Sequence, residues 1–241
     1  MKAHDNKRAE EKRMKLLKIV AFCAALVVLV TSIALAQERA TNGSTNAEIA
    51  SMAQHIVART YLNPQTGGGF ACLWFPWLYG IPEQFLFDGT TKSEKTARFT
   101  ARFTPFTSEP LPNNGDMINA LFSAGHEVQF YYKEHPSQFQ QDWDHPDAFN
   151  SGTHVATFTT RRNLLSQIGS VGFFVNSAPL TFSGDFILPD GKVYSFRDLT
   201  PGGITVHILA STTPVAGTNT PPYVQIPFSG VGIHMAHAGK H

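Results

Sequence analysis

The side chains best suited to acid–base or metal chemistry gather between positions 126 and 154. His126 and Glu127 are neighbours, and His154 lies in a later β-branched run. Imidazole and carboxylate groups bind zinc, iron or manganese where three of them converge, and His126 and His154 on adjacent strands would be the nucleus of such a metal site. The alternative is ordinary surface chemistry, because adjacent residues such as His126 and Glu127 point to opposite faces of a strand. Further candidates between them are Glu134, His135, Asp142, Asp144, His145 and Asp147.

A strand predicted at residues 96–104 decides whether these groups form an active site. Its positions alternate, with Phe99 and Phe103 on one face and Arg98 and Arg102 on the other. If both arginines enter a cavity with His126 and Glu127, the four would be catalytic residues of a barrel-type isomerase, a cyclase or a metal-dependent enzyme. If the phenylalanines fill the interior and the arginines meet water, this hypothesis loses its support.

The most aromatic stretch, residues 70–87, follows three consecutive glycines at 67–69. Large rings of this kind can form a lip that holds an apolar ligand or touches a membrane surface. They also fill protein cores, and the prolines and glycine within the stretch favour a wrapped loop with short strands. The candidate ligand-binding residues are Trp74, Trp77, Tyr79 and Phe85.

The N-terminal segment predicts export. Residues 1–36 place a basic region before the apolar run Ile19 to Val30, and Ala34-Leu35-Ala36 has the small-x-small pattern of a cleavage site. We expect a signal peptide, with an uncleaved signal anchor as the alternative, and therefore a secreted or periplasmic protein that meets the membrane only through this segment. Residues 1–36 contain seven of the 19 Lys and Arg and three of the 18 Asp and Glu, which leaves 12 basic and 15 acidic residues. A mildly acidic remainder argues against a nucleic-acid surface.

Cysteine usage and short motifs narrow the chemistry further. Only Cys72 follows residue 36, so no disulfide can form within the mature chain, and its apolar neighbours favour a buried core residue over a nucleophile. The chain has no Gly-rich phosphate loop with its Lys and Ser/Thr partners and no Gly-x-Ser-x-Gly nucleophile motif. The sequence identifies no cofactor.

The clearest local fold signal is the turn from Leu188 to Lys192. Pro189 presets φ, Asp190 can bond its own backbone and Gly191 suits a left-handed position. A three-residue loop would then place Phe186 opposite Tyr194, followed outward by Gly184 opposite Phe196 and Phe182 opposite Asp198. With a third strand at 204–209, the pattern predicts a meander.

These elements predict a mainly β protein, an antiparallel β-barrel or β-sandwich with one N-terminal amphipathic helix. The helix begins at the capping box Thr45-Asn46-Ala47-Glu48 and ends near Thr60. Candidate strands begin near 96, 127, 153, 171, 180, 192 and 204, and Met117 to Ala124 is assigned one or two helical turns. The expected divisions are 1–36 signal peptide, 37–60 polar leader and helix, 61–210 β domain, and 211–241 linker and tail with an edge strand near 223–233.

The functional hypothesis is an exported binding module, because its apolar interior or aromatic lip suits a hydrophobic small molecule or a protein partner. The enzyme built on the His, Glu and Arg residues is the alternative. Exposed strand edges or the aromatic lip would also allow a homo-oligomer.

Overall fold

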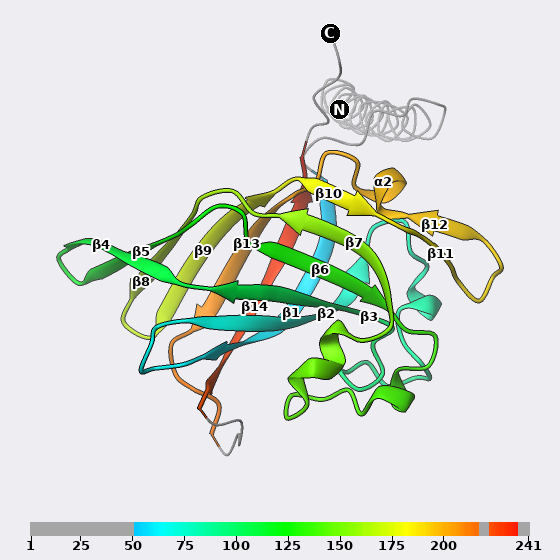
Figure 1. Cartoon of the computed structure of the whole chain (residues 1–241), viewed down its shortest axis with the longest axis horizontal. Coiled ribbons are helices and arrows are strands. Elements are labelled where there is room, and N and C mark those ends of the chain that lie inside the picture. The colour runs from blue at the N-terminus through cyan, green and yellow to red at the C-terminus, as the bar shows by residue number, and fades with distance from the viewer. Residues whose placement is uncertain (1–50, 217–221, 236–241) are drawn as a thin grey trace, which may run out of the picture. The chain divides into compact units, whose positions relative to one another are not determined.

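The computed structural model describes residues 51–216 and 222–235. The predicted signal peptide, and the predicted leader and helix as far as residue 50, lie outside these ranges. Within them, antiparallel strands dominate, and twelve form one sheet that curls into a half-barrel (Figure 1). No helix in the described ranges has the length and apolar character needed to cross a membrane.

Of the eleven neighbouring strand pairs in the described sheet, six are consecutive in the chain and five join strands that are further apart. Two parts of the sheet, around residues 159–161 and 177–179, are joined directly. Thr159 and Arg161 donate backbone hydrogen bonds to the carbonyl oxygens of Pro179 (3.0 Å) and Ser177 (2.8 Å). The sheet therefore surrounds an interior. Its strand order is β10 (Leu180–Ser183), β7 (Thr153–Thr159), β6 (Glu127–Tyr132), β3 (Phe99–Phe106), β2 (Gly69–Leu78), β1 (Met52–Leu62), β14 (Val224–His234), β13 (Ile204–Ser211), β9 (Val171–Ala178), β8 (Asn163–Ile168), β5 (Met117–Phe122) and β4 (Ser108–Asn114).

The prediction of a mainly β, antiparallel, barrel-like protein is confirmed. Each of the seven predicted runs contains a strand, namely β3, β6, β7, β9, β10, β12 (Val193–Ser195) and β13. Three short 3-10 helices, η1 (Glu83–Phe85), η2 (Pro136–Phe139) and η3 (Pro146–Asn150), lie in the long connections. Turn chemistry and period-two alternation therefore predicted the strands where one face is buried.

The predicted N-terminal helix is wrong over the part that the structure describes. Met52–Leu62 form β1, which pairs with β2 on one side and β14 on the other. Apolar residues at 52, 53, 56 and 57, followed by Thr60, fit a helical period, but both faces of β1 are covered, so its burial does not simply alternate. The β-branched residues Ile56, Val57 and Thr60 suit the strand.

The hairpin is confirmed at its tip and differs at its base. β11 (Asp185–Ile187) pairs with β12, Phe186 lies opposite Tyr194, and Gly191 has the expected positive φ of 75°. After β12 the chain turns into α2 (Phe196–Leu199), because the Ser195 hydroxyl oxygen accepts a hydrogen bond from the Asp198 backbone N–H. The predicted pairs at Phe196 and Asp198 therefore do not form, and β10 pairs with β7. The hairpin is a separate two-stranded sheet, so the predicted meander is wrong.

The sheet extends beyond the predicted limits of 61 and 210. β14 is a central strand between β1 and β13, although an edge strand is predicted there. Pro227 is tolerated because the β13–β14 ladder extends only as far as Phe228, the residue after it, which pairs with Ala210. The predicted helical turns at 117–124 are strand β5, which pairs with β4 and β8.

An aromatic cluster closes part of the interior beside the hairpin and α2. At its centre, the Phe130 ring lies 4.7 Å from Phe75, 5.0 Å from Phe158 and 5.2 Å from Phe196, between ring centroids. All four side chains are buried. Segments from distant parts of the chain therefore meet in one core.

Candidate functional site

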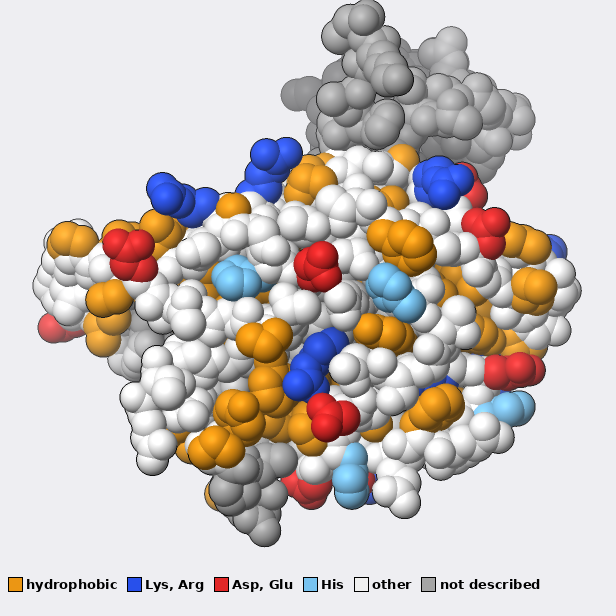
Figure 2. Space-filling model, viewed as in Figure 1, with side chains coloured by type: hydrophobic (Ala, Val, Ile, Leu, Met, Phe, Trp, Pro, Cys, Tyr) orange, Lys and Arg blue, Asp and Glu red, His pale blue; other side chains and the backbone are white. Residues whose placement is uncertain are grey.

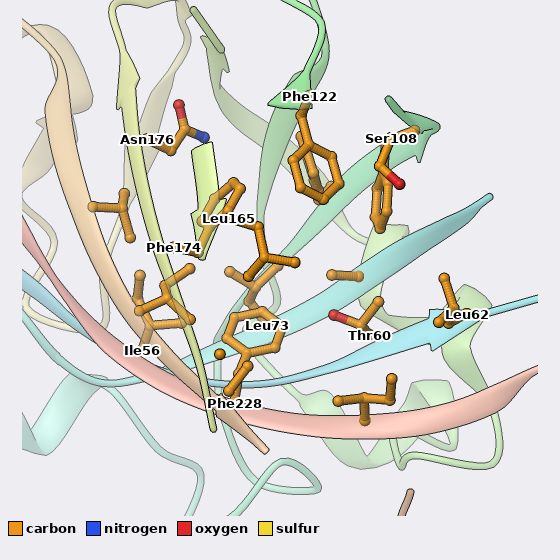
Figure 3. Close-up of a pocket in the computed structure, with 18 of the residues that line it drawn as sticks. Ile56, Thr60, Leu62, Leu73, Ser108, Phe122, Leu165, Phe174, Asn176 and Phe228 are labelled. Atoms are coloured by element: carbon orange, nitrogen blue, oxygen red, sulfur yellow. The ribbon is translucent and has the colours of Figure 1, made fainter. Parts of the chain in front are cut away.

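The concave side of the sheet contains a cavity of about 420 Å³ (Figure 3). Alternate residues on the surrounding strands point into it, as the pleat of a β-sheet requires. The volume lies within the roughly 300–1,000 Å³ of small-molecule sites. Its wall includes Ile56, Leu73, Phe103, Phe174, Val206 and Phe228.

The cavity has a buried end and an open end. Along β1 its wall follows Gln54 to Leu62, eight residue steps that span about 26 Å at ~3.3 Å per step. Gln54 and Asn176 are buried, whereas Gly67 and Ser108 at the other end are exposed. A ligand would enter past the exposed end.

The lining is uncharged. None of the described residues that line the cavity is Lys, Arg, Asp, Glu or His. On the face shown in Figure 2, cationic and anionic side chains are dispersed over the outside between apolar ones. The interior therefore offers an apolar surface with a few amide and hydroxyl groups.

Glycines on β14 allow the close packing of this wall. A Cβ atom at Gly230 would lie 2.3 Å from the carbonyl oxygen of His207, and one at Gly232 would lie 2.6 Å from Cγ of Gln54. Glycine at 232 leaves room for the Gln54 side chain over β14.

The orientation of β3 does not favour the enzyme hypothesis. Phe103 lines the cavity and Phe99 is buried in the core, while the arginines lie on the outer face. Arg102 donates hydrogen bonds to the Pro146 carbonyl oxygen (2.9 Å) and to Sγ of Cys72 (3.3 Å). Arg98 donates to the Glu134 carbonyl oxygen (3.0 Å) and forms an ion pair with Asp88 (3.2 Å). Both arginines thus fasten loops to the sheet instead of meeting water, and neither lines the cavity.

The structure does not bring the candidate histidines together. β6 pairs with β7 so that Glu127 faces Thr159 and Tyr131 faces His154. His126 and His154 are therefore at opposite ends of this pair, roughly 16 Å apart along the strands. His154 Nε2 lies 2.9 Å from Oγ1 of Thr157, and Glu127 accepts a hydrogen bond from Gln129. In the described ranges, no three His, Cys, Asp or Glu side chains are grouped so that they could hold a metal ion.

The four aromatic candidates lie away from the cavity wall. Trp74 packs against Phe87 on the outer side of the sheet, with ring centroids 5.8 Å apart. Trp77 contacts Tyr79, and Phe85 packs on the core. The cavity residues that sequence analysis missed are ordinary Ile, Leu, Val and Phe residues. The alternation Ile204, Val206, Ile208 on β13 was the available signal.

A buried lysine lies under the loop that carries η2 and η3. The Lys133 side chain, 2% exposed, donates to Oγ1 of Thr100 at 2.6 Å, and Thr100 donates to the Phe149 carbonyl oxygen at 2.9 Å. Burial disfavours the charged ammonium and lowers the pKa of Lys133 to about 7. Among the described residues, no carboxylate forms an ion pair with it. Lys133 therefore affects the stability of the fold, and it does not line the cavity.

Cys72 is confirmed as a free, buried core residue. Burial raises the pKa of its thiol to about 12, against a smaller opposing effect of Arg102. At pH 8 the reactive thiolate is then only about one part in 10⁴. We expect iodoacetamide to leave Cys72 unmodified in the folded protein and to label it in urea, as read by peptide mass spectrometry that separates it from Cys23. Rapid labelling of Cys72 without denaturant would contradict this assignment.

Comparisons with known protein families, with curated proteins and with solved structures found no match. The function is therefore argued from the cavity and its lining.

Proposed function

We propose that this protein is an exported β-barrel-like module that binds a hydrophobic small molecule in the cavity of the curled sheet. The observation that carries the proposal is an apolar cavity of about 420 Å³ with one exposed end. The export part rests on the composition of residues 1–36, which lie outside the described ranges.

Binding agrees better with the lining than catalysis does. Acid–base or nucleophilic catalysis needs a titratable or nucleophilic side chain beside the reacting atoms. The described lining residues include no carboxylate, imidazole, ammonium or thiol, so the Ser and Thr hydroxyl groups of the lining have no general base among them to activate them. Burying on the order of 300 Å² of apolar ligand surface contributes about 7 kcal/mol at ~25 cal/mol per Å², which sets micromolar affinity as the expected scale.

The proposal is tested with N-phenyl-1-naphthylamine, a neutral apolar dye that fluoresces when it leaves water. Titration of the full-length protein is expected to show one site of micromolar affinity. Ala210 lines the cavity, so Ala210→Trp should weaken binding at least tenfold by filling it. Leu209, the next residue on β13, is 61% exposed on the opposite face, so Leu209→Trp is the matched control and should bind the dye normally.

Two results would overturn the proposal. Equal loss or equal retention of dye binding in both variants would place the dye elsewhere. Absence of binding in the wild-type protein, with no apolar molecule released on denaturation and solvent extraction, would show that the cavity holds no ligand of this class.

A further inference from the structure

Three amide side chains lie in one cross-strand row near the buried end of the cavity: Gln54 and Asn176 line it, and Asn163 is the next residue of the row beyond the lining. Gln54 on β1 pairs with Gly232 on β14, Gly232 pairs with Val206 on β13, and Val206 pairs with Asn176 on β9. The β8–β9 register, in which Leu164 faces Val175, places Asn163 beside Asn176. The row therefore crosses an otherwise apolar wall.

Two of these amides have unused hydrogen-bonding atoms. Asn176 is 5% exposed and lines the cavity, and no described residue pairs with its Oδ1. Asn163 is 1% exposed, and the described residues leave both its Oδ1 and Nδ2 unpaired. A buried amide without a partner destabilises a protein by about 1–3 kcal/mol. Apolar side chains of similar size would avoid this cost, so the amides point to a function beyond packing.

The position of the amides fixes the expected ligand orientation. Asn176 borders the cavity in Figure 3, on the side away from Leu62. Leu62 belongs to the opposite end of the wall, near the exposed residues Gly67 and Ser108. A molecule that reaches the amides would enter with its polar group first and leave its apolar chain along Ile56 and Thr60.

The uncharged lining restricts what that polar group can be. A carboxylate or an ammonium would lose its hydration in the cavity without meeting an opposite charge, which is strongly unfavourable. A hydroxyl, carbonyl or amide group can exchange water for the side-chain amides at little cost.

We propose, on the premise that the cavity binds an apolar molecule as argued above, that the ligand is a neutral amphiphile. Its class is that of a long-chain alcohol, ketone or primary amide, and its polar end hydrogen-bonds to Asn176 and Asn163 at the buried end. The amides thus select against both ionised lipids and plain hydrocarbons.

Displacement of N-phenyl-1-naphthylamine from the full-length protein at pH 8 tests this specificity. The competitors are 1-dodecanol, 1-chlorododecane, which has the same shape without a hydroxyl, and dodecanoate, which is ionised. We expect the alcohol to bind about tenfold more tightly than the chloride, and dodecanoate to bind most weakly.

Two asparagine variants test whether the amides cause the preference for the alcohol. Asn176→Leu and Asn163→Leu should each lower the affinity for 1-dodecanol about tenfold and leave 1-chlorododecane unchanged. Each should also melt at an equal or higher temperature without ligand, because an unpaired buried amide is removed. Ser177→Leu, at the neighbouring outward-facing position, is the control and should not alter the preference.

The outcomes separate this inference from the proposed function. If the dye binds in the cavity but alcohol and chloride compete equally, water satisfies the amides as well as a ligand does, and the inference fails while the proposed function stands. Tightest binding of dodecanoate, or an unchanged alcohol preference in both amide variants, would also overturn it. If the dye does not bind at all, both proposals fail together.

Discussion

Replacing Lys133 by methionine is expected to raise the free energy of unfolding at pH 7 by about 3 kcal/mol and to remove a pH-dependent loss of stability. Burial lowers the pKa of this lysine from 10.5 to about 7 in the folded protein. The unfolded chain therefore binds more protons than the folded one between these two values, and wild-type stability rises with pH across that window. Below about pH 7 Lys133 is charged in both states, so the full free-energy cost of burying the charge applies and this contribution to wild-type stability is at its lowest. Methionine has a similar length and carries no charge, so its main loss is the hydrogen bond to Thr100, worth ~1 kcal/mol.

Urea unfolding at pH 6, 7, 8 and 9 measures this effect. From pH 9 to pH 7, the stability gained by Lys133→Met should grow by about 2 kcal/mol, at 1.36 kcal/mol per pKa unit. The series ends at pH 9 because the raised pKa of Cys72 makes stability fall with pH above that point. Lys192→Met is the control, since the Lys192 side chain is 75% exposed at the hairpin tip, and it should leave the pH dependence unchanged. The same pH profile in wild type and Lys133→Met would show that the ammonium is solvated.

The sequence predicted local structure well where apolar and polar residues alternate strictly or a turn needs special residues. The alternation at 96–104 and the turn at 188–192 are both present in the structure. The prediction for β1 was wrong because the loop that leads to η3 covers its outer face. There the Tyr61 hydroxyl donates a hydrogen bond to the Trp143 carbonyl oxygen. With both faces covered, apolar residues occur at positions that also fit a helix. β14 was missed because its proline is tolerated only where the neighbouring ladder has ended.

The candidate site was harder to predict because its residues are chemically ordinary and become neighbours only through strand register. The histidines and arginines were chosen as candidates because their side chains can do chemistry. In the structure, Arg98 and Arg102 hold loops against the sheet. Besides the alternation on β13, Asn163 and Asn176 carry a sequence signal, since a tight turn at Gly169 joins their strands and makes them cross-strand neighbours. That Asn176 lines a cavity, with Asn163 beside it, depends on the curl of the whole sheet, which no local sequence pattern contains.

The second large effect is expected in the aromatic cluster, where Phe130→Ala should lower the free energy of unfolding by about 4 kcal/mol. The Phe130 ring contacts three other buried rings that come from β2, β7 and α2. Truncation removes the transfer energy of the ring and leaves a cavity that rigid neighbours cannot fill, for which costs of about 3–5 kcal/mol are typical. Chemical denaturation at pH 8 measures the loss.

Phe173→Ala is the matched control for that substitution. Phe173 also lies in a strand and is aromatic, but it is 44% exposed on the outer face of β9, so its truncation should cost less than about 1 kcal/mol. Phe130→Leu, which keeps most of the apolar surface, should fall between the two. Equal losses for Phe130→Ala and Phe173→Ala would mean that the cluster does not hold the sheet together. A loss of stability that decreases from Phe130→Ala to Phe130→Leu to Phe173→Ala would instead place the main stabilising contacts beside the hairpin. The residues of the apolar cavity wall could then suit a ligand with little loss of fold stability.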